Sequence, residues 1–133
     1  MIHKINIDTH ARVEFQDITG MVRDIVEASG VQSGVCHVFV PHTTAAVMIN
    51  EHADPDVMED IGAQLDLIAP QNNKYRHSEG NSPAHIKASL IGDSKAILVE
   101  YGSLALGTWQ GIFFCEFDGP RRRSLMVKIV ADK

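Results

Sequence analysis

The chain has 133 residues, of which 44% are hydrophobic and 22% charged, so it suits one packed domain and is too apolar for a disordered chain. Twelve Lys and Arg residues stand against 17 Asp and Glu residues, and the net charge of −5 argues against non-specific nucleic-acid binding. No apolar segment is long enough to cross a membrane and no signal peptide is recognisable, so we expect a single cytoplasmic domain over residues 1–133.

The first fifty residues predict three strands and one helix. Residues 2–7 alternate like a short strand. Thr19 then predicts the N-cap of a helix, which Gly30 ends. Residues 35–40 and 45–50 are apolar runs typical of buried strands.

The rest of the chain predicts two more helices and three more strands. Asp54-Pro55-Asp56 combines an acidic N-cap with a proline at the first helical position, and Ser82-Pro83 opens a shorter helix. The polar segment 70–82 between them is long enough for a functional loop. Strand-like runs follow at 95–101, 109–117 and 124–131. Because strands outnumber helices and do not alternate with them, we predict an α+β fold, an antiparallel-rich, sandwich-like sheet with helices packed on it.

Three of the seven histidines are candidates for a metal site. His42 follows a strand end, His77 lies in the polar loop, and His85 falls in the first turn of the helix after it. Three histidines that converge from separate elements, with a fourth position open, suit a functional zinc site. The alternative is a set of ordinary surface or hydrogen-bonded histidines.

Two glutamates are candidates for a site because of their strand register. Glu51 alternates with Val47 and Ile49, and Glu116 alternates with Ile112 and Phe114. A carboxylate at the edge of a core is costly unless it is paired, and such pairing often marks a site. The alternative is that the strand end twists each side chain into water.

Trp109 follows a glycine-spaced turn, residues 102–111, that lacks the Gly-Lys-Ser/Thr of a phosphate-binding loop. A lone tryptophan most often packs in the core; the other interpretation is a flat wall for a heteroaromatic ligand. The following strand is apolar on both faces, which predicts cover on both sides, by another subunit among the options. Cys36 and Cys115 are far apart, form no CxxC motif, and favour reduced thiols.

Three blocks of residues, in order, resemble the YjbQ family, formerly UPF0047. The first is His42-Thr43-Thr44-Ala45-Ala46 with Asn50-Glu51 and Asp54-Pro55-Asp56. The second is Tyr75-Arg76-His77, Glu79-Gly80-Asn81 and Ala84-His85-Ile86-Lys87. The third is Gly107-Thr108-Trp109-Gln110-Gly111 with Glu116 and the arginine run 121–123. The sequence departs from many relatives in the short segment 81–84, which lacks paired aspartates, and at Phe117, where they carry a histidine.

The resemblance implies a sandwich-like subunit that assembles as a homotrimer, with a polar pocket near His42, His77 and His85. It also implies thiamine-phosphate synthase activity, a transferase reaction that joins a hydroxymethylpyrimidine diphosphate to a thiazole phosphate and releases pyrophosphate. Magnesium with Lys87 and the arginine run would stabilise the departing charge. Trp109 would stack on the pyrimidine, and the remaining substrate contacts would come from Asn50, Asn81, Gln110 and Arg122.

Two other functions remain open at this point. One is a zinc-dependent hydrolase or lyase, with the three histidines as ligands and Glu51 or Glu79 as the base. The other is a trimeric protein that binds a phosphorylated metabolite without turnover. All three alternatives share a pocket for a small molecule and predict neither a nucleic acid nor a membrane as partner.

Overall fold

The computed structural model describes residues 1–133, and its strands form two antiparallel sheets. The larger sheet has the order β1-β8-β3-β5-β6 and the smaller β2-β7-β4. The strands are β1 (His3–Asp8), β2 (Glu14–Asp17), β3 (Ser33–Phe39), β4 (Ala45–Glu51), β5 (Ser94–Glu100), β6 (Ser103–Leu104), β7 (Gln110–Glu116) and β8 (Arg122–Ala131). The predicted α+β fold with an antiparallel-rich, two-layered arrangement is confirmed.

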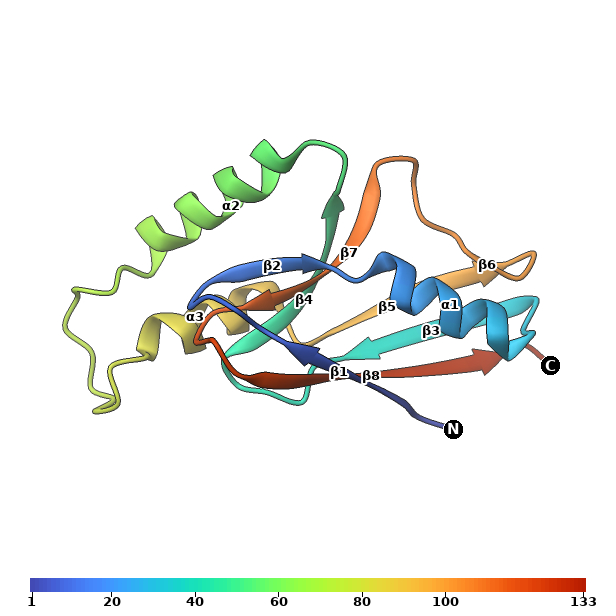
Figure 1. Cartoon of the computed structure of the whole chain (residues 1–133), viewed down its shortest axis with the longest axis horizontal. Coiled ribbons are helices and arrows are strands. Elements are labelled where there is room, and N and C mark those ends of the chain that lie inside the picture. Colours follow the sequence, from blue (N-terminus) through green and yellow to red (C-terminus); the bar gives the residue numbers. More distant parts are fainter.

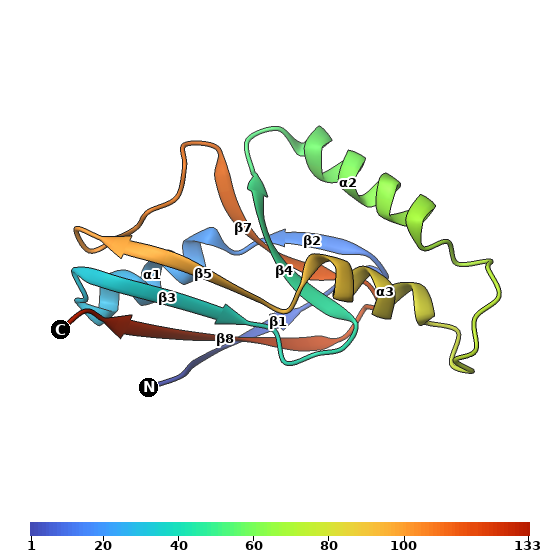
Figure 2. The same ribbon diagram turned by 180° about the vertical axis from the view of Figure 1, so that it is seen from behind.

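Three helices accompany the sheets: α1 (Thr19–Ser29), α2 (Pro55–Ile68) and α3 (Ser82–Ile91). Figure 1 shows the larger sheet along one side of the molecule, with β2, β4 and β7 crossing it and α2 standing out beyond them. Seen from behind in Figure 2, α3 lies next to β4. None of the helices is both long and apolar enough to cross a membrane.

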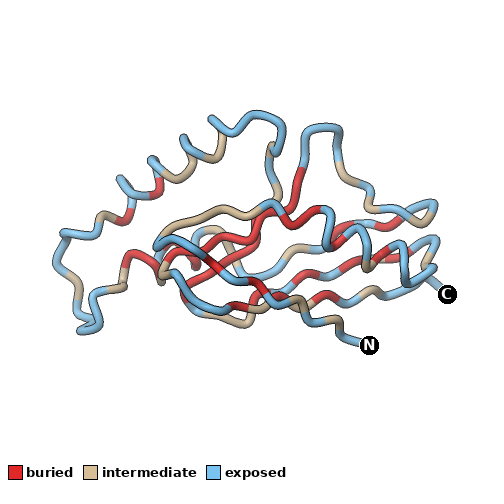
Figure 3. Tube along the Cα trace, viewed as in Figure 1, coloured by how far each residue is buried: buried red, intermediate tan, exposed pale blue.

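The core lies on both faces of β7, as the two-faced apolar pattern predicted. Ile112 and Phe114 are fully buried in the cluster shared with α1 and the larger sheet. Phe113, Cys115 and Phe117 point the other way, into a second cluster with residues of α2 and α3. Figure 3 shows this buried centre and the largely exposed α2. The second face is therefore covered by helices of the same chain, so a neighbouring subunit is not needed to cover it.

The helix starts show one correct and one wrong capping prediction. Asp54 is the N-cap of α2, and its carboxylate accepts a hydrogen bond from the Asp56 N–H. Thr19, however, is the first residue of α1 rather than its N-cap. Its hydroxyl donates to Asp17 and accepts from the Ile112 N–H at 2.9 Å, because the neighbouring strand β7 needs that acceptor. Asp17 instead accepts the Thr19 N–H.

The pairing of β4 with β7 decides which functional candidates can meet. Ala45 lies opposite Glu116 at one end of this pair, and Glu51 lies opposite Gln110 at the other. A seven-residue strand at about 3.3 Å per residue keeps these two ends roughly 20 Å apart. Side chains at the Ala45–Glu116 end of the pair are therefore too far from side chains at the Glu51–Gln110 end to share one small-molecule site.

Candidate functional site

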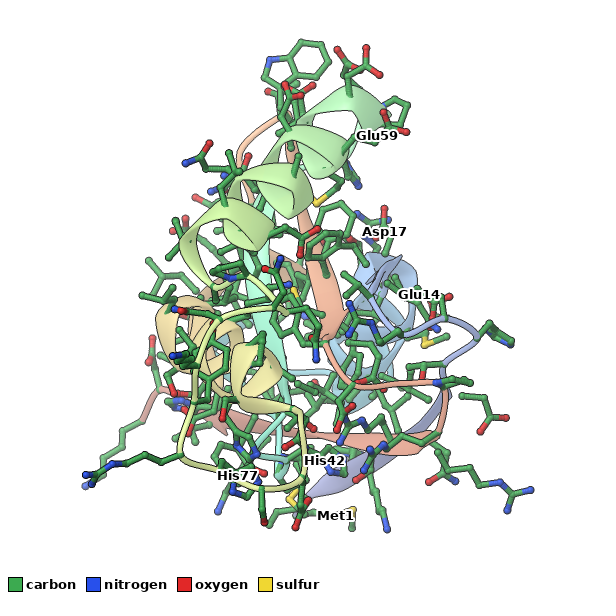
Figure 4. All side chains as sticks on the ribbon, turned by 90° about the vertical axis from the view of Figure 1, so that its left-hand side faces the viewer. Met1, Glu14, Asp17, His42, Glu59 and His77 are labelled. Atoms are coloured by element: carbon green, nitrogen blue, oxygen red, sulfur yellow. The ribbon has the colours of Figure 1, made fainter.

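Two adjoining cavities of about 500 and 510 Å³ form an open cleft at the Ala45 end of β4. Thr43 and His85 line both cavities, and His42 lines the first. The second has no hydrophobic lining; its other residues are Thr44, His77, Glu79, Asn81, Asp118 and Arg121. We call the two cavities together the histidine cleft. Figure 4 shows His42 and His77 at the same end of the molecule.

The three predicted histidines reach this cleft from three different elements. His42 comes from the β3–β4 loop, His77 from the loop before α3, and His85 from the first turn of α3. The rings of His77 and His85 stand edge to face with their centroids 5.3 Å apart. The Glu79 carboxylate lies 3.8 Å from His77 Nε2. His42 and His85 line the first cavity and His77 and His85 the second, so one pocket shared by all three histidines stays a prediction.

His42 holds a defined tautomer because of a backbone contact. Its Nε2 accepts a hydrogen bond from the Ser124 N–H at 3.0 Å, so the proton of the neutral ring sits on Nδ1. Burial and the nearby Arg123 guanidinium lower the pKa of His42 below its usual value. His42 is therefore a neutral ring whose Nε2 lone pair is already used.

A buried ion pair lies directly behind the cleft. Arg123 donates to both carboxylate oxygens of Glu116, and both side chains are almost completely buried. Burial alone would raise the pKa of Glu116, but the bonds from Arg123, the Asp118 N–H and the Thr9 hydroxyl outweigh it and hold that pKa below its ordinary value. The predicted inward register of Glu116 is confirmed.

This ion pair also fixes two walls of the cleft. Arg123 donates to the Thr44 hydroxyl at 2.8 Å, and Glu116 accepts from the Asp118 N–H at 3.0 Å. Asp118 in turn accepts from the Asn81 side-chain amide at 2.9 Å and from Arg121 at 3.0 Å. The buried pair thus joins Thr44 on one side of the cleft to the Asp118 loop on the other.

The N-terminal end of α3 opens toward the cleft, where the Asp118 carboxylate accepts a hydrogen bond from the Asn81 side chain. Asn81 is its N-cap residue but makes no side-chain capping bond, and the first turn holds no acidic residue. The helix dipole places partial positive charge at this end. Arg121 adds a half-exposed guanidinium, which also neutralises Asp118. The site thus combines polar donors, the positive end of α3 and one guanidinium with the carboxylates of Glu79, Asp93 and Asp118.

The structure separates four of the predicted substrate and catalytic residues from this cleft. Asn50, Glu51, Trp109 and Gln110 lie at the opposite end of the β4–β7 pair. Trp109 is 62% exposed, so its interpretation as a core residue is wrong. Glu51 accepts a hydrogen bond from the Asp54 N–H next to the start of α2, which explains why it turns from the apolar side of β4.

Two predicted basic residues also lie outside the histidine cleft. Lys87 is buried and donates to Asp66 of α2, which ties α3 to α2. The Arg122 side chain is 96% exposed and lies 4.0 Å from Asp8 of β1. Of the residues assigned a catalytic or substrate-binding role from the sequence, Glu79, Asn81 and Arg121 of the arginine run line the cleft.

Thr43, Thr44 and Asp118 line the cleft but were given no role from the sequence. The two threonines belong to the first family block, so a signal was present for them. Asp118 carries no signal of its own, because its role depends on the fold of the β7–β8 loop.

The predicted three-histidine metal site fits the structure only in part. His77 and His85 are close enough to face a common ion, but His42 Nε2 is occupied by the Ser124 N–H. No three His, Cys, Asp or Glu side chains are gathered in a metal-binding arrangement. A zinc ion at the histidines, or magnesium, stays a prediction, and no chemical step is derived through either.

Comparison with known proteins gives one family. The sequence model described as "UPF0047 protein YjbQ-like" matches residues 3–132. The chain is 50% identical to UPF0047 protein MJ1081 of Methanocaldococcus jannaschii over 133 residues, all of this chain and 96% of that one. It is 46% identical to YugU of Bacillus subtilis over 131 residues, which is 98% of this chain and 99% of that one.

Solved structures show the same fold. A YjbQ/UPF0047 protein of Clostridium acetobutylicum superposes with a TM-score of 0.94 at 53% identity, over 96% of this chain and 99% of that one. A protein of Sulfolobus solfataricus described as YbjQ-like and of unknown function superposes with a TM-score of 0.96 at 37% identity, over 99% of this chain and 97% of that one.

These comparisons correct the predicted activity. The matching family and relatives are described as UPF0047 proteins, and a solved relative is described as of unknown function. None of these descriptions carries thiamine-phosphate synthase activity, so the assignment of that transferase reaction is wrong. The geometry agrees with the correction, because Trp109 and Gln110 lie far from the histidines they were expected to join.

Proposed function

The chain belongs to the UPF0047 YjbQ-like family, and from the geometry of its cleft we propose that it binds a small phosphorylated metabolite there. One observation carries the proposal: a cavity of about 510 Å³ without hydrophobic lining lies at the uncapped N-terminus of α3. Helix N-termini attract phosphate groups through free N–H groups and the helix dipole. In the first three residues of α3 the N–H left for a ligand is that of Ser82, because Pro83 has none and the Ala84 N–H donates to the Asn81 carbonyl. The cavity is within the size range of small-molecule sites.

Charged and polar side chains support the same ligand class. Arg121 provides a guanidinium that suits phosphate oxygens; its Nε and Nη2 donate to Asp118, which leaves Nη1 for a ligand. Thr43 and Thr44 add hydroxyl donors from the opposite wall, and His77 and His85 add ring nitrogens between them. The missing hydrophobic lining disfavours a ligand with a large apolar body.

Adjacent arginines offer a matched test by calorimetric titration with inorganic phosphate and pyrophosphate. Arg121→Gln should weaken binding about tenfold, as expected for the loss of one charge-assisted hydrogen bond. Arg122→Gln should leave it unchanged, because that side chain is 96% exposed and lies outside the cleft. His85→Gln serves as a second cleft variant. Failure of both anions to bind the wild type, or equal losses in the two arginine variants, would reject the proposal.

We also propose that the chain assembles as a homotrimer through the outer face of the larger sheet. No helix covers this face, and Val35 lies between Leu98 and Val130 across three neighbouring strands. Leu98 is 65% and Val130 48% exposed. A contiguous exposed apolar patch commonly marks an interface. Val35, Leu98 and Val130 would therefore be buried by assembly.

Sedimentation equilibrium tests this assembly. The wild type should have three times the monomer mass, and Leu98→Glu should dissociate it. Leu67→Glu is the control, because Leu67 is a comparably exposed leucine on α2. A monomeric wild type, or a trimer that survives Leu98→Glu, would contradict this interface.

Free, buried thiols support a reducing compartment such as the cytoplasm for the protein. Cys36 and Cys115 are unpaired. Burial raises the pKa of Cys36 to about 11 and that of Cys115 to about 12, so both remain unreactive thiols. Persistent labelling of either cysteine in the native protein by a thiol reagent would argue against this.

A further inference from the structure

A second set of cavities lies beneath α2, away from the histidine cleft. One cavity of about 420 Å³ and another of about 240 Å³ share Phe15 and Met58 as lining residues. Phe15 belongs to β2 and Met58 to α2, so the two cavities follow the gap between this helix and the smaller sheet. We call them together the α2 groove.

The floor of the α2 groove is apolar. Val13, Phe15 and Met58 line it, with Phe113 at the end near the start of α2. Gly62 faces the Phe15 ring, and a Cβ built at Gly62 would lie 3.3 Å from that ring. The glycine therefore lets α2 pass close to Phe15 while space remains on either side. An apolar ligand body of modest size fits such a floor.

The rim of the groove is acidic along its whole length. Six carboxylates line the two cavities: Glu14, Asp17, Glu51, Asp54, Glu59 and Asp66. Only Asp66 meets a lysine or arginine, the ammonium of Lys87. Figure 4 shows Glu59 on α2, with Asp17 and Glu14 below it on the same side of the molecule. A cleft lined by charges of one sign concentrates ligands of the opposite sign.

At the end of the groove near the start of α2, the His52 ring is held in a fixed orientation. His52 Nδ1 lies 3.0 Å from Asp17 Oδ2, and Asp17 Oδ1 is fixed by the Thr19 N–H and hydroxyl. Burial alone would raise the pKa of Asp17, but these contacts outweigh it and lower that pKa. Gly111 has no Cβ to collide with the His52 ring, which a Cβ would approach to 2.5 Å. Asp17 is therefore a fixed carboxylate at this end.

From this combination we propose that the α2 groove binds a small organic cation, a primary amine on a short aromatic or aliphatic body. The body lies on Phe15, Met58 and Phe113, and the ammonium group lies among the rim carboxylates. The same negative rim repels phosphorylated compounds, so this site is separate from the histidine cleft and does not depend on the function proposed for it. A neutral ligand of the same shape gains the apolar contact but not the charge contact.

The experiment uses 2-phenylethylamine as the probe and 2-phenylethanol as its neutral analogue. Titration of the full chain at low salt, followed by NMR, should shift the Met58 methyl and Phe15 ring signals. The amine should bind about fivefold more tightly than the alcohol, a preference consistent with partly exposed charge pairs. Added salt should reduce the preference, because these pairs are accessible to solvent.

Glu59→Gln and Glu27→Gln are matched variants of exposed carboxylates. Glu59 lines the groove, whereas Glu27 lies on α1. The first variant should weaken amine binding two- to fivefold, and the second should leave it unchanged. Shifts elsewhere than Met58 and Phe15, equal affinity for the amine and the alcohol, or equal losses in both variants would overturn the proposal.

Discussion

Three consecutive arginines, which look alike in the sequence, have three different environments in the structure. Arg121 faces the histidine cleft, Arg122 is exposed beside β1, and Arg123 is buried against Glu116. Alternation along the start of β8 explains the opposite directions of Arg122 and Arg123. From the sequence, the whole run was expected to stabilise the departing charge, and Arg122 was expected to contact the substrate. The different environments of the three arginines depend on which residues pack against each face of β8 and against the loop before it.

The buried pair gives a sharp prediction at the residue scale. Arg123→Met should destabilise the protein by about 3–5 kcal/mol, because it leaves the Glu116 carboxylate buried without its partner. Arg122→Met, an exposed neighbour, should change stability by less than about 0.5 kcal/mol. Urea unfolding at neutral pH measures both. Equal stability of the two variants would contradict the burial of the Arg123–Glu116 ion pair.

The same pair predicts how the difference depends on pH. In the wild type the pKa of Glu116 is held below its ordinary 4.5, so its stabilisation is present above that pH and is lost as the pH falls through the lowered pKa. In Arg123→Met burial would dominate and raise that pKa, so the variant gains stability as the pH falls. The difference in unfolding free energy should therefore shrink as the pH falls, first above pH 4.5 through the raised pKa of the variant and then below pH 4.5 through the lowered pKa of the wild type. A difference independent of pH would contradict the assignment.

At the scale of elements, β3 and β8 approach each other closely at Gly34. A Cβ built at Gly34 would lie 2.1 Å from the Val130 carbonyl oxygen, a backbone atom that cannot move without breaking the ladder. Gly34→Ala should therefore cost about 3 kcal/mol or more. Gly20→Ala, in α1 with nothing within 4 Å, should be neutral or slightly stabilising. Thermal unfolding of the two variants checks this, and similar melting temperatures would refute the register of β3 and β8.

The elements with strong local signals could be predicted from the sequence. Asp54 and Pro55 predicted the start of α2, and the alternation around Leu125 and Val127 predicted β8. The short strands β2 and β6 were missed, because four and two residues are too few for a recognisable pattern. The division into two sheets could not be predicted, since it depends on pairing between segments far apart in the chain.

The candidate site could be predicted only where one element carries several of its residues. Asn81 and His85 are placed by α3, so their proximity follows from local sequence. The separation of Trp109 from His42 depends on the antiparallel pairing of β4 with β7, which turns the ends of the two motif blocks away from each other. Lys87 likewise turns to Asp66, on a helix whose position the sequence does not define.

Considered as a whole, the molecule separates two kinds of surface. The histidine cleft joins the positive end of α3 to Arg121, whereas the α2 groove carries an acidic rim. The smaller sheet lies between them, with its second face covered by α2 and α3. The net charge of −5 is therefore unevenly distributed: six carboxylates line the α2 groove, whereas three carboxylates and Arg121 line the two cavities of the histidine cleft.

The position of a bound phosphate tests this account most directly. Titration of inorganic phosphate into isotope-labelled protein should shift the backbone amide signals of Thr43, Thr44, Asn81 and Arg121. The Trp109 indole signal should not move, because Trp109 lies at the far end of the β4–β7 pair. Shifts at Trp109 and Gln110 without shifts around Asn81, or no shifts at any of these residues, would contradict the assignment of the histidine cleft as the ligand site.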